Sequence, residues 1–354
     1  MPLRTVEVRA AGRFMGRRCG AWRGMQPART VAMEFTGDIR AVLRRAPPLD
    51  IAAATRLWGA LLDGALDDVE VGAIVAALAV AGETPEELAG FCDAAQSRVA
   101  TIATTREPGL VAIPAYGLFA GEGAIVALTA MLLRRFELRV LVHGVLDAPC
   151  GASCARVLRE LDVLPSASLA RAQEELAARA IAFVPVHLLS PALARLLALR
   201  SRLGVDSSAH VVAPLLDPTL GVAMRLVLDA DGARGAMRER LLAGACGDAL
   251  ALTWSGEQAS SSVMLRRPRI ERWRAGAREL LFEADGQELR VPPSPALDDA
   301  VATAAVIRAI ATGRAPMPVP ALNLVAACLY AAGRAPDFAR AKAAAAVAGG
   351  RLAA

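Results

Sequence analysis

The order of apolar and polar positions divides the chain into a helical part and a mixed part. Within residues 35–104 the apolar positions recur at helical spacing, and a helix capped by Asp50 is expected to run through Leu62. A second helix is expected over Val69–Ala81. Thr84–Glu87 is a strong helix start, because it combines a Thr cap, Pro at the first helical position and Glu three residues after the cap. The pattern predicts an all-helical block.

Beyond this block, strand-like and helix-like segments alternate. A short apolar run, Leu110–Pro114, precedes an apolar segment of helical length, Gly123–Arg135, and a second strand-like run, Val140–Val142. Strand, helix, strand over about thirty residues is a βαβ unit, whose ligand crevice lies beyond the carboxyl ends of the parallel strands. Those ends are loops 114–121 and 143–154. Any ligand chemistry is therefore expected in these two loops.

The remaining sequence keeps the mixed pattern. Further strands are expected at Ile181–Val184, Val222–Leu228, Ala249–Trp254 and Glu279–Ala284, and further helices at Val157–Leu161, Leu169–Ala180, Pro191–Leu203, Val319–Ala332 and Pro336–Ala348. Such alternation favours a mostly parallel sheet with helices on both faces. The predicted fold class is α/β, with a small all-helical N-terminal domain beside a large α/β domain.

Composition limits the class of protein. With 354 residues and 55% hydrophobic content, the chain can bury a large core. Its most apolar windows, Ala124–Leu133 and Ala321–Ala332, are shorter than the roughly 20 residues that span a bilayer, so no membrane segment is expected. Of the six cysteines only Cys150 and Cys154 lie close together, which favours a reducing, cytoplasmic setting. No histidine or cysteine set has metal-ligand spacing, so no metal site is expected.

Positive charge is concentrated at the N-terminus. The net charge is +5, but residues 1–32 carry seven arginines against one acid, and the remaining 33 bases and 34 acids leave a net charge of −1. We expect residues 1–32 to be a disordered arginine-rich extension or a mis-called start, with a mitochondrial-type presequence as the alternative. Any basic binding surface in the body of the protein must then be local.

The segment Leu265–Arg274 is one local concentration of charge, with five arginines against one acid. Arginine can bind phosphate bidentately and stack on bases, and a tryptophan offers a stacking face. A second cluster is expected beside the crevice strand. The predicted nucleic-acid-binding residues are Arg134, Arg135, Arg139, Arg266, Arg267, Arg269, Arg272, Trp273 and Arg274. The alternative is that these arginines form a solvated surface.

A family resemblance adds to this reading. The segment Arg200–Pro218 resembles the R-x-x-LG-x-R-T-x-x-N-x-x-GPL-x-NP signature of the anthranilate phosphoribosyltransferase family. Residues 72–95 resemble the N-terminal helical domain of that family, and Leu141–Gly144 resembles the strand that ends in its KHG motif. The likeness covers residues 35–350 in order, and it implies a nucleoside phosphorylase or phosphoribosyltransferase-like fold.

The same resemblance implies a division into domains. Residues 33–104, with the helix at 187–204, are expected to form a helical dimerisation domain. Residues 105–354 are expected to form the α/β domain. The chain would then assemble as a homodimer.

The family's phosphate-binding motifs match this chain poorly. In place of the GTGGD loop, whose glycines let backbone N–H groups approach pyrophosphate, this sequence reads Ile113–Gly117. Pro114 lacks a backbone donor and Tyr116 is expected to block close approach. The N-x-S-T motif that follows in the family becomes Gly121–Ala124, in which Glu122 would repel phosphate. The resemblance therefore implies the fold without the pyrophosphate site.

Other substrate positions are kept only in part. His143 and Gly144 remain from the KHG motif, but its lysine is replaced by a valine. The Asp-Glu pair that binds Mg²⁺ in the family appears as Gly256-Glu257, which leaves one carboxylate. Arg200 matches the arginine that contacts the aromatic substrate, but the next family arginine is an aspartate here. A complete or vestigial substrate site would consist of Tyr116, Gly117, His143, Gly144, Ser153, Arg200 and Glu257.

In lacking these motifs, the chain resembles the YbiB-type proteins, a sister group that keeps the fold and is described as nucleic-acid binding. Two functions are weighed on this basis. The first is a non-catalytic homodimer that binds single-stranded or double-stranded nucleic acid without a cofactor. The second is a phosphoribosyltransferase that acts on a phosphoribosyl pyrophosphate-like substrate with Mg²⁺. The first is preferred, because one retained substrate contact does not make an active site.

Overall fold

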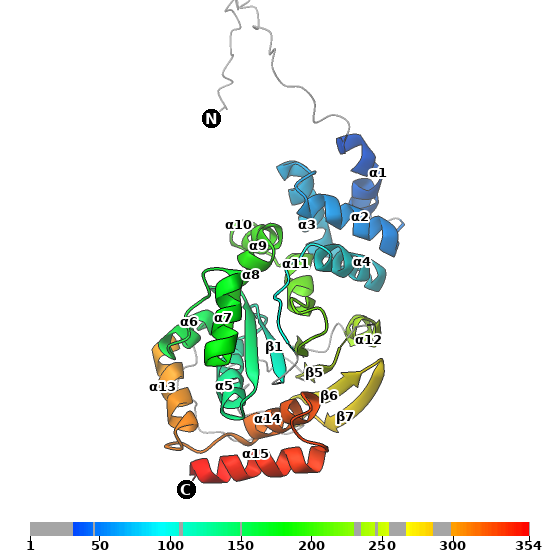
Figure 1. Cartoon of the computed structure of the whole chain (residues 1–354). Coiled ribbons are helices and arrows are strands. Elements are labelled where there is room, and N and C mark those ends of the chain that lie inside the picture. The colour runs from blue at the N-terminus through cyan, green and yellow to red at the C-terminus, as the bar shows by residue number, and fades with distance from the viewer. Residues whose placement is uncertain are drawn as a thin grey trace, which may run out of the picture.

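The chain forms a block of helices beside a sheet that helices cover on both faces (Figure 1). The computed structural model describes residues 31–44, 47–105, 109–148, 151–229, 235–244, 247–254, 267–285 and 299–353. The expectations for residues 1–30 and for Arg266 and Glu257 lie outside this description.

The helical block contains four helices near the N-terminus: α1 (Val31–Arg44), α2 (Ile51–Leu62), α3 (Asp68–Ala81) and α4 (Pro85–Gln96). The expected start signals are present. The Asp50 carboxylate accepts a 2.7 Å hydrogen bond from the backbone N–H of Ala53. Thr84 and Glu87 form a capping box that begins α4. The stacked rings of Trp58 and Phe91, whose centroids lie 4.3 Å apart, join α2 to α4.

The sheet has seven strands in the order β3-β2-β1-β4-β5-β6-β7. The strands are β1 (Leu110–Ala115), β2 (Arg139–Gly144), β3 (Ile181–Pro185), β4 (Met224–Asp229), β5 (Ala249–Thr253), β6 (Arg269–Arg274) and β7 (Ala277–Phe282). The first five run parallel, and β6 and β7 add an antiparallel hairpin. This confirms the predicted α/β class with a mostly parallel sheet.

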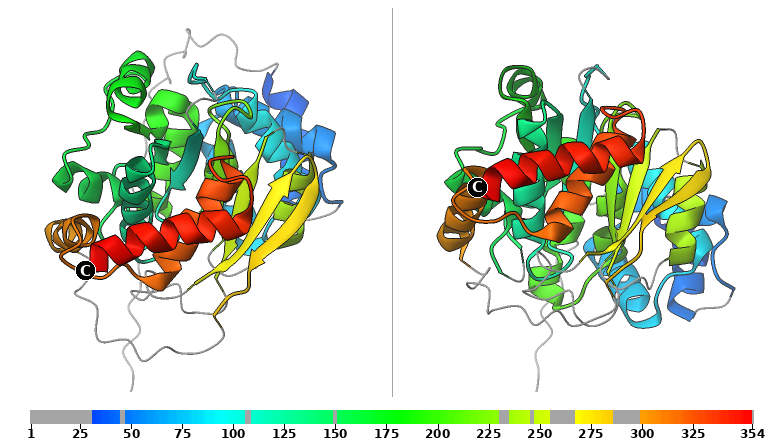
Figure 2. Two further views of the ribbon diagram at one scale, coloured as in Figure 1. Left: turned by 60° about the horizontal axis from the view of Figure 1, so that its bottom comes forward. Right: turned by 90° about the horizontal axis from the view of Figure 1, so that it is seen from below.

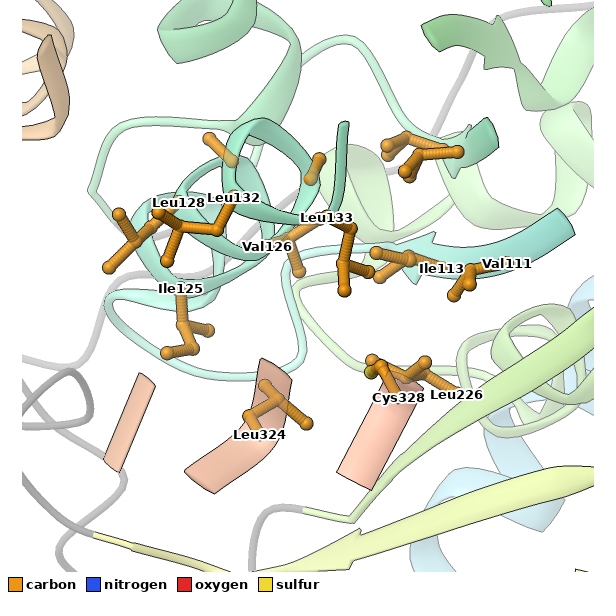
Figure 3. Packing of buried hydrophobic residues seen from close by; sticks show 14 of the residues in the cluster. Val111, Ile113, Ile125, Val126, Leu128, Leu132, Leu133, Leu226, Leu324 and Cys328 are labelled. Carbon is orange, nitrogen blue, oxygen red and sulfur yellow. The ribbon is translucent and has the colours of Figure 1, made fainter. Parts of the chain in front are cut away.

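The βαβ unit is formed as the sequence predicts. Strands β1 and β2 pair in parallel from Leu110↔Arg139 to Ala115↔Gly144, and α5 (Glu122–Arg135) connects them. Because α5 is apolar on almost every side, it lies between the sheet and a second layer of helix. Figure 3 shows Leu133 of α5 beside Ile113 of β1, and Ile125 of α5 pointing toward Leu324 of α14 (Val319–Ala331).

The side chains on the two faces of β1 pack into two different hydrophobic cores. Val111 and Ile113 belong to the core beneath α5 and α14, whereas Leu110 and Ala112 belong to the core shared with the helical block. This alternation is the period-2 pattern of a strand buried on both sides. The helical block is therefore packed directly on one face of the sheet.

The other helices are α6 (Cys154–Glu160), α7 (Leu169–Arg179), α8 (Val186–Leu189), α9 (Pro191–Ala198), α10 (Arg200–Leu203), α11 (Ser208–Val212), the 3₁₀ turn η1 (Ala213–Leu215), α12 (Gly235–Gly244), α13 (Ala300–Ala311) and α15 (Phe338–Ala353). The single helix expected at Pro191–Leu203 is thus two helices, α9 and α10. Helix α15 runs along α14, with the β6–β7 hairpin beside them (Figure 2). In the part of the chain that the structure describes, no helix is long and apolar enough to cross a membrane.

Strand β6 is the main departure from the expected elements. The sequence suggests an exposed arginine segment there, whereas Ile270, Glu271, Arg272 and Trp273 are all buried in a strand. Two of these buried residues are charged, so the hydrophobic pattern could not reveal the strand. Helices α12 and α13 were also not expected.

Candidate functional site

The loop after β1 closes on a carboxylate of its own chain. Glu122, the first residue of α5, is 2% exposed. Its carboxylate accepts hydrogen bonds from the backbone N–H groups of Gly117, at 3.0 Å, and Leu118, at 2.5 Å. Gly117 and Gly121 adopt left-handed backbone conformations, with φ of 73° and 85°, which turn the loop around the carboxylate. The backbone N–H groups of Gly117 and Leu118, in the loop between β1 and α5, are therefore bonded within the chain and are not free to bind an incoming anion.

Burial controls the charge of this group. Burial raises the pKa of the Glu122 carboxyl to about 7, although hydrogen bonds from the backbone of Gly117, Leu118 and Tyr116 oppose the rise. The Glu122 carboxyl is therefore about half ionised near pH 7. In its charged form it accepts the hydrogen bonds of the loop between β1 and α5, whereas the sequence predicted only repulsion of phosphate.

Tyr116 and His143 form a buried pair at the ends of β1 and β2. The Tyr116 hydroxyl lies 3.1 Å from Nδ1 of His143, and both side chains are buried. Burial lowers the pKa of His143 to about 4, with Asp217 opposing the shift and Arg225 adding to it. The imidazole is therefore neutral at physiological pH. Its hydrogen bond to Tyr116 holds the two loops of the crevice together.

The crevice loops also approach each other at two glycines. A Cβ on Gly144 would lie 1.7 Å from the carbonyl oxygen of Ala115, and a Cβ on Gly123 would lie 2.3 Å from that of Ala152. Only glycine fits either position without movement of the backbone. The close approach of Gly123 to Ala152 places loop 151–153 against the start of α5. Ser153, at the end of this loop, caps α6 (Cys154–Glu160).

Ser153 uses its hydroxyl within the protein. It donates a 2.6 Å hydrogen bond to the carbonyl of Leu146 and accepts one from the backbone N–H of Arg156, which caps α6. Both hydrogen bonds of the Ser153 hydroxyl are therefore made to the backbone of its own chain.

Arg200 borders a separate cleft of about 660 Å³ between Tyr116, Val186, Leu197 and His210. Its guanidinium pairs with Asp206 at 3.0 Å, and Nε2 of His210 lies 3.6 Å from the same carboxylate. Asp206, which stands where the family has a second arginine, thus neutralises the charge of Arg200. Tyr116 brings this cleft next to the closed β1 loop.

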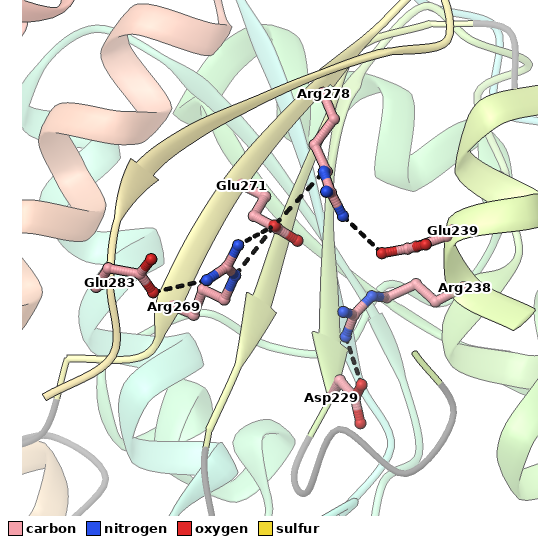
Figure 4. A network of polar contacts seen from close by, with 7 residues as sticks. All are labelled: Asp229, Arg238, Glu239, Arg269, Glu271, Arg278 and Glu283. Carbon is pink, nitrogen blue, oxygen red and sulfur yellow. Dashed lines mark hydrogen bonds and ion pairs between the residues drawn. The ribbon is translucent and has the colours of Figure 1, made fainter. Parts of the chain in front are cut away.

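Carboxylates that could hold a metal are not gathered at the carboxyl ends of the strands. Asp229, the last residue of β4, pairs with Arg238 of α12 (Figure 4). No group of three or more histidine, cysteine, aspartate or glutamate side chains among the described residues could hold a metal ion.

The arginines of the β6–β7 hairpin are held in ion pairs. Arg269 donates to Glu271 at 3.0 and 2.9 Å and to Glu283 at 2.6 Å, and Arg278 links Glu271 to Glu239 of α12 (Figure 4). Arg267 pairs with Asp285 at 2.8 Å. Binding of phosphate by Arg267 or Arg269 would have to compete with these carboxylates.

Trp273 and Arg272 point to opposite sides of β6. Trp273 is 6% exposed and packs with Val227 and Leu242 beneath α12, so its ring presents no open stacking face. Arg272 is 8% exposed, and its guanidinium stacks 4.3 Å from the ring centre of Tyr330 on α14. Arg274, next along the strand, is exposed and lies 3.7 Å from Asp248.

The second arginine cluster lies at the opposite end of the sheet from the crevice. Arg139 is the first residue of β2, and Arg134 and Arg135 end α5. They lie beside the crevice strand β2, as expected, at its amino end, whereas the crevice loops follow its carboxyl end. The end of the sheet at which the parallel strands β1–β5 begin is called the amino edge. Because β6 runs antiparallel to β5, its last residues, Arg272 and Arg274, reach this amino edge. Arg272 and Arg274 thus share one edge with Arg134, Arg135 and Arg139, four strand spacings or roughly 19 Å away, whereas Arg267 and Arg269 lie toward the opposite edge.

Comparison with known proteins agrees with this fold. Residues 39–99 match the helical bundle domain of a glycosyl transferase family. The chain is 32% identical over 180 residues to the uncharacterized protein YbiB of Escherichia coli (strain K12), covering 50% of this chain and 56% of that protein. It is 29% identical over 170 residues to the anthranilate phosphoribosyltransferase of Caldicellulosiruptor saccharolyticus, covering 48% and 51%. The alignments span about half the length of these curated relatives.

Solved structures extend the likeness across the molecule. Anthranilate phosphoribosyltransferase from Thermus thermophilus superposes with a TM-score of 0.63 at 23% identity, covering 87% of this chain and 92% of that one. The enzyme from Saccharomyces cerevisiae in complex with PRPP and Mg superposes with a TM-score of 0.67 at 13% identity, covering 90% and 94%. This chain has the anthranilate phosphoribosyltransferase fold. At these identities the likeness concerns the fold alone.

Proposed function

We propose that this protein is a non-catalytic homodimer that binds nucleic acid on an anthranilate phosphoribosyltransferase-like fold. The observation that carries the non-catalytic part is the hydrogen bonding of Glu122 to Gly117 and Leu118. A phosphoribosyltransferase depends on backbone donors that hold the anion of its substrate. Here an internal carboxylate uses those donors. His143 is buried, neutral and bonded to Tyr116.

The amino edge of the sheet supports the nucleic-acid part. Arg134 and Arg135 are exposed there and make no ion pair with any described carboxylate, and Arg135 donates a hydrogen bond to the backbone carbonyl of Ala311. Arg272 and Arg274 reach the same edge from β6. Arginines along a surface of this length can follow a phosphate backbone without reading sequence. The ion-paired Arg267 and Arg269 contribute less in this proposal, because each phosphate contact there replaces an existing carboxylate contact.

The helical block supports the dimer. Helix α3 carries apolar residues around its whole circumference, yet Val69 and Val80 are 80% and 89% exposed. Exposed apolar residues on an otherwise packed helix favour an interface with a second protein surface. A symmetric pair of chains joined through this block satisfies that surface, because a two-fold interface uses the same patch on both subunits.

One observation favours a second candidate. The cleft beside Arg200 has the volume of a small-molecule site and an apolar lining. It would suit the aromatic substrate of a phosphoribosyltransferase that uses Mg²⁺. The proposal disfavours this reaction, because Asp206 already pairs with Arg200 and the neighbouring phosphate loop is closed.

A transferase assay separates the two candidates. Purified protein is incubated with anthranilate, phosphoribosyl pyrophosphate and Mg²⁺, with an active anthranilate phosphoribosyltransferase as the positive control. We expect no phosphoribosyl anthranilate above background. Robust turnover that depends on Mg²⁺ would overturn the non-catalytic proposal and favour the second candidate.

A further inference from the structure

A cavity of about 180 Å³ opens at the amino edge of the sheet, away from both crevice loops. It is bordered by the starts of β1 and β4, by the end of α14, and by Asp248, Arg272 and Arg274. The cavity is large enough for an oxyanion such as phosphate.

The charged group in its wall is incompletely bonded. Arg272 is 8% exposed, yet its guanidinium donates no hydrogen bond to any described residue, and its Nε is buried without a partner. Glu279 and Asp248 lie at 3.6 and 3.8 Å, which are ion-pair distances but beyond hydrogen-bond length. A buried guanidinium normally satisfies most of its five donors. Arg272 therefore has donor capacity left for a ligand.

The surroundings hold this guanidinium in place. The Tyr330 ring lies 4.3 Å below it, and the Tyr330 hydroxyl donates to the Glu279 carboxylate at 3.2 Å. Stacking on an aromatic ring leaves the edge of the guanidinium fork facing outward. Arg274 supplies a second, exposed guanidinium at the same cavity, against the single lining carboxylate of Asp248. The lining side chains carry two positive charges and one negative charge, and Glu279, which pairs with Arg272 from outside the lining, supplies a second negative charge.

We propose that the Arg272 cavity binds a phosphate group through Arg272 and Arg274. Phosphate matches the two-pronged donor geometry of arginine and tolerates the nearby Asp248 because two guanidiniums face it. The proposal rests on the proposed function in one respect: in the nucleic-acid complex the bound group is a backbone phosphate. Arg134 and Arg135, at the same edge, would then contact phosphates farther along the strand.

The test uses the full-length chain and three single variants. Arg272→Lys keeps the charge but removes the planar fork, and Arg274→Ala removes an exposed charge with little risk to folding. Arg171→Ala is the matched control, because Arg171 is an exposed arginine on α7, ion-paired with Glu174 and Glu175. Residues 1–32 are common to all four proteins, so their charge cancels in every comparison.

The first arm measures thermal unfolding in inorganic phosphate and in chloride at equal ionic strength. At about ten times its dissociation constant, phosphate should raise the midpoint of the wild type and of Arg171→Ala by roughly 2 °C more than that of Arg272→Lys. If Arg272 only packs on Tyr330, Arg272→Lys loses stability equally in both salts. Equal increments in phosphate for all proteins would contradict the anion site.

The second arm measures anisotropy of a labelled oligothymidylate at several salt concentrations. Arg272→Lys should weaken binding roughly threefold to tenfold, and Arg274→Ala should lower the salt slope by about 0.7, while Arg171→Ala changes neither. An effect of the variants on phosphate but not on the oligonucleotide would leave an anion site and contradict the backbone-phosphate assignment. No effect in either arm overturns the proposal. Failure of the wild type to bind the oligonucleotide counts separately, against the proposed function.

Discussion

The Glu122 carboxylate accepts a 3.0 Å hydrogen bond from the backbone N–H of Gly117, in the loop between β1 and α5. This contact joins the start of α5 to the loop that follows β1. We propose that it takes the place of a bound anion, so that the chain keeps the fold without a phosphate site. The consequences for stability and for ligand binding can be measured separately.

The first prediction concerns pH. Burial raises the pKa of Glu122 to about 7, from an ordinary value of 4.5. The native state therefore binds more protons than the unfolded state between these values. The stability from this group is fully present below pH 4.5 and is lost as pH rises through 7, by about 3 kcal/mol.

Urea unfolding of the wild type and of Glu122→Gln from pH 4.5 to 8 checks this. The wild type should lose stability relative to the variant across that window, since the neutral amide does not titrate. Parallel curves for the two proteins would show that Glu122 titrates normally in the native state.

The second prediction concerns the approach of the crevice loops. Gly144→Ala places a Cβ 1.7 Å from the Ala115 carbonyl oxygen, so it should destabilise the protein by about 1–3 kcal/mol or more. Gly72→Ala in α3 is the control, because a Cβ there meets nothing within 4 Å. It should stabilise the protein by about 0.5–1 kcal/mol. Similar free energies of unfolding for both variants would contradict the close approach.

The third prediction separates packing from binding at β6. Trp273→Ala should cost about 3–5 kcal/mol in the free energy of unfolding, because the ring is buried against Val227 and Leu242. Arg274→Ala, one residue away and exposed, should change it by less than about 0.5 kcal/mol. A Trp273→Ala protein that is as stable as the wild type would mean that the ring is open to ligands.

A feature of this structure could be predicted from the sequence when the residues that cause it lie only a few positions apart. The capping box of Thr84 and Glu87 and the strand–helix–strand run from Leu110 to Gly144 follow from residues a few positions apart, and they formed as expected. Strand β6 could not be predicted in this way. Its buried Glu271 and Arg272 depend on partners such as Arg278 and Tyr330, which only the tertiary fold brings near.

The candidate site shows the same division. The loss of the glycine loop and the presence of Glu122 could be seen in the sequence, but the carboxylate's hydrogen bonds required the turn at Gly121. Arg139 lies on the crevice strand as expected, at the amino end of β2 and away from the crevice loops. Glu257 and Arg266 lie outside the described residues, so their expected roles stay predictions.

The fourth prediction concerns assembly. Light scattering at micromolar concentration should give the mass of a dimer. Val80→Glu should shift it toward the monomer, because Val80 is 89% exposed on the apolar helix α3. Val301→Glu, an exposed valine on α13, is the control and should leave the mass unchanged. A wild-type monomer would contradict the proposed homodimer.

The most direct test of the account is the salt dependence of oligothymidylate binding by a chain that starts at Met33, which removes all seven arginines of residues 1–32. The wild-type sequence should bind, with affinity that falls steeply as salt rises. The double variant Arg134→Ala, Arg135→Ala should bind more weakly, with a slope shallower by about 1.4 for two lost phosphate contacts. No binding at moderate salt, or an unchanged slope in the variant, would show that the amino edge of the sheet is not a nucleic-acid surface.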